Sequence, residues 1–563
     1  MDREFHLQNV LPGKNRTEGI NGNMTTTPYD TIVIGSGIGG MATSRMLAEY
    51  GGHRVLLLEQ HFKPGGLVHT FERQGKYRFG IGLHYVGLKG EKDFPTKIMD
   101  YMADGKVAWE KLPDNYDNFV YPGMSFSASS DQPTTIARLK EQFPDEARAL
   151  DQFYKNLSKN MRGMYAIRVV SSMPWFLKSW LLPWVKWRFP DVLKTANAYL
   201  DESFQSNELK AILSSVWGDM GVPPSRMAYG YLAILHWHYE QGASFPVGGV
   251  KTFSQAILDG IKSRGVDILT RRYVEEILIE NGRAVGVKAR NKSNDKLETY
   301  HAEQVVSDAG AYNTYVRMLP AAIQKDYKEE LEKLCPSISG CILFVGLKDS
   351  PKTIGLDGGN IWMYPSFDHD ENYNAPPGEG LLYLSFPSMK DPDAAHHTVE
   401  ILTLTHRSRF EEWKEEDWPR KNESYVAHKE SIAKRIIERI DEKYQGFAQL
   451  VDYQELATPL TFETFQNSPL GQFYGLPVTK ERILSPLKRA RTPIKGLYLA
   501  GQDVTGPGMV PGLLSGLEVT TAIITKGKVL KMIRDIARRQ HPCPTVEVLK
   551  ARMPPKLNTE YVA

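Results

Sequence analysis

Hydrophobic and polar positions follow two patterns near the start of the chain. Residues 31–34 form an apolar run rich in β-branched side chains, which is typical of a buried parallel strand. Beyond a glycine-rich turn, apolar residues recur at helical spacing as far as Leu47, and Gly51 and Gly52 end that helix. Residues 54–58 repeat the strand pattern. The order strand, helix, strand predicts a βαβ unit and therefore an α/β fold.

The same patterns return in blocks along the rest of the chain. Residues 99–190 have mostly helical periodicity, whereas short strand patterns recur at 266–309 and at 497–500. A hairpin is expected through Asn281 and Gly282. The predicted organisation is a flexible N-terminal arm (1–28), a nucleotide-binding domain in three segments (29–92, 246–320 and 485–540), a discontinuous α+β substrate and membrane-docking domain (93–245 and 321–484), and a loose tail (541–563).

The turn after the first strand carries the sequence GSGIGG at 35–40. In such a turn Gly35 permits the tight bend, Gly37 lets backbone N–H groups approach a pyrophosphate, and Gly40 lets the helix pack closely on the strand. Glu59 ends the second strand nineteen residues after Gly40 (59 − 40), where a carboxylate accepts a hydrogen bond from a ribose 2′-OH. Together these features predict a dinucleotide site, and an acid at this position disfavours NADP.

Composition and charge exclude several classes of protein. Hydrophobic residues make up 41% and charged residues 24% of the chain, as in an ordinary globular protein, and the net charge of +3 is too small to indicate nucleic acid as a partner. Three cysteines provide no disulfide framework and no metal-ligand spacing, so we expect no metal site and a reducing compartment. We expect no signal peptide and no transmembrane helix, because the apolar runs are too short.

Residues 171–190 form a segment rich in tryptophan and lysine, SSMPWFLKSWLLPWVKWRFP. Tryptophans beside cations suit a membrane interface, whereas lysines at this frequency are unfavourable in a core. A core helix or a contact between two copies of the chain is the alternative. We therefore expect the region Trp175–Trp187 to dock on a membrane surface. The protein itself is then expected to be peripheral and monotopic, on the cytoplasmic side of that membrane.

Beyond these patterns, the chain resembles a known family. It is similar to the FAD-dependent retinol saturases, carotenoid isomerases and phytoene desaturases, within the wider amine-oxidase-like flavoproteins. The segments that carry the resemblance are VIGSGIGG (33–40), LEQHFKPGGLVHTF (58–71), FGIGLHYVG (79–87), FPVGGVKTF (245–253), VVSDAGAY (305–312), TPLTF (458–462), GQFYG (471–475) and KGLYLAGQDV (495–504).

The resemblance implies a Rossmann-type FAD-binding domain and a role for particular residues. Glu59 is expected to bind the adenosine ribose, Val274 the adenine through its backbone, and Asp503 the pyrophosphate or the ribityl hydroxyls. The segment Gly508–Gly516 is expected to direct a helix N-terminus at the flavin, which stabilises negative charge on the reduced ring. The full set of expected FAD contacts is Gly35, Gly37, Ile38, Gly39, Gly40, Glu59, Gln60, Gly65, Gly66, Leu67, Val274, Asp308, Gly501, Asp503, Val510 and Gly512.

The implied activity is hydride transfer at flavin N5, to or from a C=C or C–C bond of a long hydrophobic polyene or lipid. Such a reaction also moves a proton, and His84 and Tyr85 are the candidate catalytic residues, although a histidine among aromatic residues is more often a core residue. Alternatives are a carotenoid cis–trans isomerase that uses reduced FAD, an amine oxidase, and a non-catalytic prenyl-binding protein on the same scaffold. If the protein is such an oxidoreductase, we expect an external electron donor or NAD(P)H as a further partner.

Overall fold

The computed structural model describes residues 29–90, 92–171, 173, 175–334, 338–416, 418–420 and 422–539. The predicted N-terminal arm and C-terminal tail, at 1–28 and 541–563, lie outside these residues.

A parallel sheet is formed by strands from the three segments that were expected to make up the nucleotide-binding domain. Strand β1 (Tyr29–Ile34) lies between β12 (Lys296–Ser307) and β2 (Val55–Leu58), with β9 (Asp267–Leu269) beyond β2 and β18 (Leu497–Leu499) beyond β12. All of these pairings are parallel, and β2 is buried along its whole length, as strands covered on both faces are. The carboxyl ends of β1, β2 and β12 therefore open at one edge, where ligands bind in such sheets.

Helices and a β-meander flank this sheet. Helix α1 (Ile38–Met46) packs closely on α18 (Met509–Ile523) and also contacts α9 (Gly249–Lys262). Strands β10 (Arg272–Glu280) and β11 (Arg283–Asn291) continue antiparallel from β12. The hairpin expected between them is confirmed, because both residues of its turn have positive φ, 48° and 72°.

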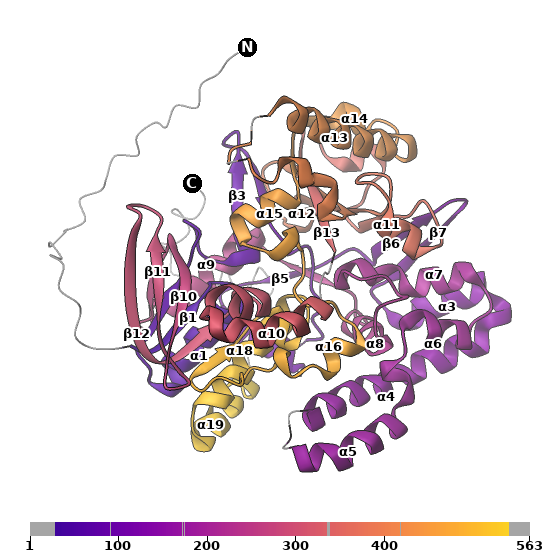
Figure 1. Cartoon of the computed structure of the whole chain (residues 1–563). Helices are drawn as coiled ribbons and strands as arrows, with labels where there is room; N and C mark the ends of the chain where they lie inside the picture. The colour runs from indigo at the N-terminus through magenta and orange to yellow at the C-terminus, as the bar shows by residue number, and fades with distance from the viewer. Residues whose placement is uncertain are drawn as a thin grey trace.

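A second, mostly antiparallel sheet lies beside the first (Figure 1). Its strand order is β17-β13-β16-β15-β14-β6-β7, and only the β14–β6 pair is parallel. Helix α13 (Glu423–Lys443) buries Ile432, Ile436 and Ile440 in the core cluster that this sheet helps to form. The strands are β6 (Asn115–Tyr121), β7 (Met124–Ser129), β13 (Ser339–Leu347), β14 (Asn360–Met363), β15 (Leu382–Ser385), β16 (His397–Thr405) and β17 (Val451–Ala457).

The helical prediction for residues 99–190 is wrong in its first part. Residues 109–129 hold the short strand β5 (Trp109–Lys111) and the hairpin β6–β7. In this hairpin Phe119 and Tyr121 point to the same side at a spacing of two, which is the period of a strand. The sequence did not reveal these strands because each is short and because Asn, Asp and Ser occupy many positions between the apolar residues, which weakens the strand pattern.

Helices dominate the part of the chain that directly follows β7. They cluster at the lower right of Figure 1, where α4 and α5 run side by side at the edge of the molecule. These helices are α3 (Gln132–Gln142), α4 (Ala147–Ser171), α5 (Trp175–Arg188), α6 (Ala196–Ser203), α7 (Asn207–Ser214) and α8 (Tyr229–His238). Among the described residues, no helix is both long and apolar enough to cross a bilayer.

Shorter elements complete the fold. Two small antiparallel sheets pair β3 with β4 and β5 with β8. The remaining strands and α-helices are β3 (Thr70–Arg73), β4 (Tyr77–Gly80), β8 (Ser244–Pro246), α2 (Phe94–Met102), α10 (Ala321–Leu334), α11 (His369–Asn374), α12 (Pro387–Lys390), α14 (Phe447–Leu450), α15 (Pro459–Gln466), α16 (Lys480–Leu484), α17 (Gln502–Thr505) and α19 (Lys526–Ala537).

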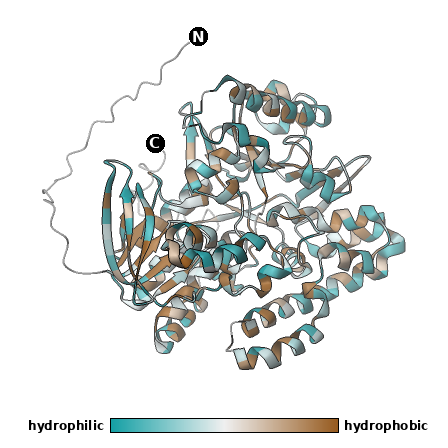
Figure 2. Ribbon diagram, viewed as in Figure 1, coloured by the Kyte–Doolittle hydropathy of each residue, from teal (hydrophilic) through white to brown (hydrophobic). Residues whose placement is uncertain are grey.

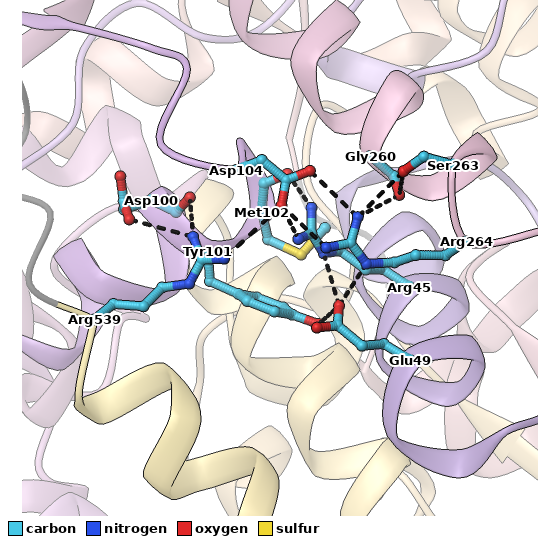
Figure 3. A network of polar contacts seen from close by, with 10 residues as sticks. All are labelled: Arg45, Glu49, Asp100, Tyr101, Met102, Asp104, Gly260, Ser263, Arg264 and Arg539. Carbon is cyan, nitrogen blue, oxygen red and sulfur yellow. Dashed lines mark hydrogen bonds and ion pairs between the residues drawn. The ribbon is translucent and has the colours of Figure 1, made fainter. Parts of the chain in front are cut away.

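A buried ionic network joins helices that lie far apart in the sequence (Figure 3). The guanidinium of Arg45, on α1, is fully buried and is paired with Asp104. Arg264 binds Asp104 at 3.0 Å and Glu49 at 2.5 Å, and Arg539, which follows α19, lies 3.8 Å from Asp104. The network therefore connects α1, the end of α2, α9 and α19, which are far apart in the sequence.

Candidate functional site

One cavity of about 1050 Å³ extends from the carboxyl ends of β1, β2 and β12 to the second sheet and to α8. Its walls contain the glycine turn, Glu59 and the first turn of α18, together with His84 and Tyr85. The fold thus brings together segments from both ends of the chain, as expected from their sequences.

The glycine turn has the geometry that a pyrophosphate needs. Gly35 has a φ of +93°, which side chains rarely adopt, and a Cβ atom on Gly39 would lie 2.5 Å from the amide nitrogen of Gly501 and 2.7 Å from Oδ1 of Asp308. A Cβ atom on Gly512 would collide with Ile38. Only glycine leaves this space open at the N-terminus of α1, where the helix dipole favours an anion. These residues fit the pyrophosphate of FAD.

Glu59 lies at the end of β2 and is nearly buried. Its carboxylate accepts hydrogen bonds from the backbone N–H of Ser36 (2.9 Å), the hydroxyl of Ser36 (2.5 Å) and the backbone N–H of His61 (2.7 Å). These bonds hold the carboxylate beside the glycine turn and on the cavity wall. This position fits the predicted contact with a ribose hydroxyl.

The C-terminal segment contributes a second acid and a helix N-terminus. Asp503 is buried, and its two oxygens accept the backbone N–H groups of Ala311 and Leu476, each at 2.6 Å. Helix α18 begins after Gly508, whose φ is +99°, and its first turn lines the cavity. Pro511 lies in that turn and has no N–H to donate, so the dipole and the preceding N–H groups act on a ligand there.

The structure brings nearly all the predicted cofactor residues to one cavity. All of them line it except Gly40 and Gly65. A Cβ atom on Gly40 would lie less than 3.0 Å from the carbonyl oxygen of Gly35, so this glycine serves helix packing. Gly65 has a φ of +125° and donates its N–H to the hydroxyl of Ser36 at 2.9 Å, which holds the following loop against the turn.

His84 lies on the cavity wall and faces a buried acid. Its Nδ1 atom is 3.0 Å from Oε2 of Glu400, which is fully buried on β16. The two atoms are at ion-pair distance without the alignment of a hydrogen bond. The other oxygen of Glu400 accepts the backbone N–H of Gly80 at 2.7 Å. A histidine oriented by a carboxylate can hold and release a proton at its second nitrogen.

Tyr85 belongs to a second group of polar residues on the same wall. Its hydroxyl donates to Asp219 at 2.9 Å, and Tyr239 donates to the same oxygen at 3.2 Å. The two phenol rings stack with a centroid distance of 4.8 Å. Burial raises the pKa of Asp219 to about 6, although the two tyrosine hydrogen bonds act in the opposite direction. Burial, together with Asp117 and Asp219, raises the pKa of Tyr85 well above its ordinary value.

A buried polar chain lies behind this wall. Asp117 accepts hydrogen bonds from Asn360 and Trp362, each at 3.0 Å, and Lys390 donates to Asn360 at 2.6 Å and to the carbonyl of His84 at 2.9 Å. Burial raises the pKa of Asp117 to about 7 and lowers that of Lys390 to about 7. The backbone of the predicted catalytic segment is thus fixed by a buried lysine.

Sequence reasoning missed Asp219, Tyr239, Glu400 and Lys390. Glu400 offered a signal, because it is a lone acid inside the apolar strand TVEILTLT, where a buried charge needs a partner. Asp219 offered none, since it lies in a short 3₁₀ segment whose place on the cavity wall depends on the packing of α7 and α8.

Comparison with known proteins also supports a flavin as the ligand of this cavity. A family model described as flavin-containing amine oxidoreductase matches residues 38–524, which is most of the chain. The chain belongs to the flavin-containing amine oxidoreductase family. Within curated proteins it is 31% identical to the all-trans-retinol 13,14-reductase of Rattus norvegicus, over 88% of this chain and 86% of that protein. It is 25% identical to the chloroplastic prolycopene isomerase of Arabidopsis thaliana, over 87% and 81% of the two chains.

Solved structures of the same fold include the cyclohexylamine oxidase of Brevibacterium oxydans. The TM-score is 0.59 at 14% sequence identity, and the match covers 90% of this chain and all of that one. This member of the flavin-containing amine oxidoreductase family therefore has the predicted α/β fold, FAD as its cofactor, and the activity of an oxidoreductase.

Proposed function

We propose that the protein reduces or desaturates a C=C or C–C bond in a long hydrophobic polyene, such as a retinoid or carotenoid. The observation that carries this proposal is the cavity of about 1050 Å³, which joins the FAD cradle to an aromatic wall bearing His84 and Tyr85. The names of the two curated relatives, a retinol reductase and a prolycopene isomerase, support a polyene as the substrate. We also propose that the second sheet and the helices α3 to α8 form the substrate domain.

The chain's own residues supply the proton side of this reaction. When bound, FAD exchanges a hydride with one carbon of the double bond. A proton must reach the neighbouring carbon during saturation, and His84, oriented by Glu400, is placed to donate it from the cavity wall. Asp219, held by the two tyrosine hydroxyls, is the second ionisable group on that wall.

The test is anaerobic incubation of dithionite-reduced protein with retinoids, carotenoids and unsaturated fatty acids, followed by mass analysis. A product heavier by two hydrogens identifies a saturase. Loss of two hydrogens with the oxidised protein identifies a desaturase, and an unchanged mass with altered retention identifies the isomerase suggested by the second relative. No conversion of any polyene would contradict the proposal.

Replacing His84 by alanine is expected to lower kcat by roughly 10²–10⁴-fold, the usual contribution of a positioned proton donor. The FAD content is expected to stay unchanged, because His84 is not among the expected FAD contacts and its side chain pairs with Glu400 on β16. Turnover under saturating substrate and the flavin absorbance of the purified variant measure the two effects. His301→Ala, an exposed position on β12, is the matched control and should change neither. Undiminished turnover of H84A would remove His84 from the mechanism.

We further propose that helix α5 docks on a lipid surface. Trp175, Trp180 and Trp187 are 80%, 85% and 75% exposed, so the alternative of a core helix does not explain them. Figure 2 shows hydrophobic and hydrophilic segments interleaved along α5. Exposed tryptophans with neighbouring cations match the headgroup region of a bilayer, where the rings lie at the interface and the cations meet anionic lipid.

Part of the cavity wall belongs to α4, which packs against this helix. Tyr165, on α4, lines the cavity and is also 52% exposed, and Val169 follows one turn later with 57% of its surface exposed. Helices α4 and α5 are in direct contact. We therefore propose that a polyene passes from a lipid layer to the site along this side of α4.

The double variant Trp175→Glu/Trp180→Glu is expected to lose most of its binding to vesicles of phosphatidylcholine and phosphatidylserine. Burying a large apolar side chain contributes about 1.5–3 kcal/mol, so each substitution should weaken partition by roughly tenfold or more. Co-sedimentation with vesicles measures the effect. Val426→Glu, an exposed apolar position on α13, is the control. Equal sedimentation of the double variant and the unsubstituted protein would exclude α5 as the docking element.

A further inference from the structure

Asp308 occupies an unusual place for an acid. It follows β12, and its carboxyl group is enclosed by the glycines of the cofactor cradle, where Cβ atoms on Gly37, Gly39 or Gly501 would all lie less than 3.0 Å from its oxygens. It also lines the cavity at the N-terminus of α1. This is the place where the pyrophosphate of FAD, which carries two negative charges, is expected to bind.

Three acids, Glu59, Asp503 and Asp308, lie around the expected pyrophosphate site. They differ in the number of hydrogen-bond donors that each carboxyl group receives. The carboxylate of Glu59 receives two backbone N–H groups and one hydroxyl, and that of Asp503 receives two backbone N–H groups. Within the described residues, the carboxyl group of Asp308 receives one backbone N–H, from Gly40. Glu59 and Asp503 are therefore satisfied as anions, whereas Asp308, which is half-buried on the cavity wall, receives fewer donors from the protein than either of them.

The charges that face Asp308 are also unfavourable to a third anion. The charged groups that act on it are the carboxylates of Glu59, at the end of β2, and Asp503, on α17, and no cation of the described residues is among them. The dipole of α1 can offset part of one negative charge, and the bound cofactor would bring two more. A neutral carboxyl group avoids this repulsion and can donate a hydrogen bond to an acceptor.

We propose that Asp308 is a neutral carboxylic acid in the FAD-bound protein, so that FAD binding takes up one proton at this residue when the pH is high enough to ionise it beforehand. The inference rests on the assignment of FAD as the cofactor. Asp308 is then a positioning residue of the pyrophosphate site. Its protonation state determines how tightly the cofactor is bound.

The direction of the pH effect follows from this coupling. Burial raises the pKa of Asp308 to about 8, against a smaller opposite effect of the Gly40 N–H, while Glu59 and Asp503 raise it further. At neutral pH the free protein already carries the proton, and binding involves no uptake. Above a pH of about 8 the free protein loses the proton and must regain it on binding, so the Kd for FAD should rise toward tenfold per pH unit.

The test is titration of the FAD-free protein with FAD, followed by flavin fluorescence, at several values between about pH 7 and pH 9.5. The unsubstituted protein should hold FAD with constant Kd near neutral pH and progressively more weakly above about pH 8. Asp308→Asn, which has the same shape and no titratable proton, should bind with a Kd that does not change with pH. In weakly buffered solution at the upper end of this range, FAD addition should remove close to one proton per site from solution for the unsubstituted protein and none for D308N.

Controls separate this inference from the cofactor assignment. Glu59→Gln should bind FAD more weakly and keep the pH slope, because it leaves Asp308 in place, but the slope should begin at a lower pH because Glu59 no longer raises the pKa of Asp308. A slope that persists in D308N, or a Kd of the unsubstituted protein that is constant up to pH 9.5, would overturn the inference while FAD remains the cofactor. Failure of the unsubstituted protein to bind FAD at any pH would instead overturn the cofactor assignment.

Discussion

Replacing Gly40 by alanine is expected to weaken FAD binding by about 100-fold. A Cβ atom at this position would lie less than 3.0 Å from the carbonyl oxygen of Gly35 and 3.1 Å from Cβ of Asp308. Both neighbours are part of the turn or packed against it, so α1 must move away from the turn that faces the pyrophosphate. An overpacked contact costs up to about 3 kcal/mol, which corresponds to roughly two orders of magnitude in Kd.

The FAD content of the purified G40A variant and its Kd from flavin fluorescence measure this loss. Gly527→Ala on α19 is the matched control, because a Cβ atom there meets nothing within 4 Å. Chemical denaturation of the FAD-free forms separates a local effect on the turn from a general loss of folding. A G40A protein that is purified fully yellow, with a Kd within threefold of that of the unsubstituted protein, would show that the turn does not depend on this close approach.

Replacing Arg45 by alanine is expected to lower the free energy of unfolding by about 3–5 kcal/mol, the usual cost of removing one partner of a buried ion pair. Arg45 is fully buried, donates to the carbonyl of Met102 at 2.9 Å, and lies with its guanidinium carbon 4.3 Å from the centre of the Tyr101 ring. Its loss leaves a cavity and removes a cation from Asp104 and Glu49. Because the network joins α1 to α2, α9 and α19, several elements should loosen together.

Chemical denaturation of R45A measures this change. The same substitution at Arg534, an exposed position on α19, should alter stability by less than about 0.5 kcal/mol. The double variant R45A/D104A should be less destabilised than the sum of the two single variants, because the pair is coupled. Additive effects would show that Arg45 stabilises the fold by packing alone.

Local sequence predicted the parts of the site in which a backbone conformation is required. The glycines at 35–40, Glu59 after a strand, and the glycine-rich entry to α18 could be identified because each satisfies a requirement of a turn or a helix N-terminus. The Tyr85 hydroxyl and its acid partner could not be paired in advance. They are separated by 134 residues and meet only because the 3₁₀ segment before α8 packs against the loop after β4.

The burial of Arg45 in the core also could not be predicted from the local sequence. In the sequence it is a cation in a helix with an apolar face, and an exposed position is the ordinary expectation for it. The structure buries it completely and pairs it with Asp104, which follows α2. Arg264, after α9, and Arg539, after α19, lie against the same carboxylate from other distant segments. The strands β6 and β7 were missed for a related reason, since the pairing of β6 with β14 places this hairpin in a sheet whose other members lie more than two hundred residues later.

By itself, then, the sequence determined the α/β class, the FAD cradle and the resemblance that led to the family, because these depend on short motifs with strict backbone requirements. Only the three-dimensional structure reveals which acids face His84 and Tyr85, and that the carboxyl group of Asp308 is enclosed by the glycines of the cradle. Those features depend on contacts between residues far apart in the chain, and local patterns carry no information about which distant side chain will become a neighbour.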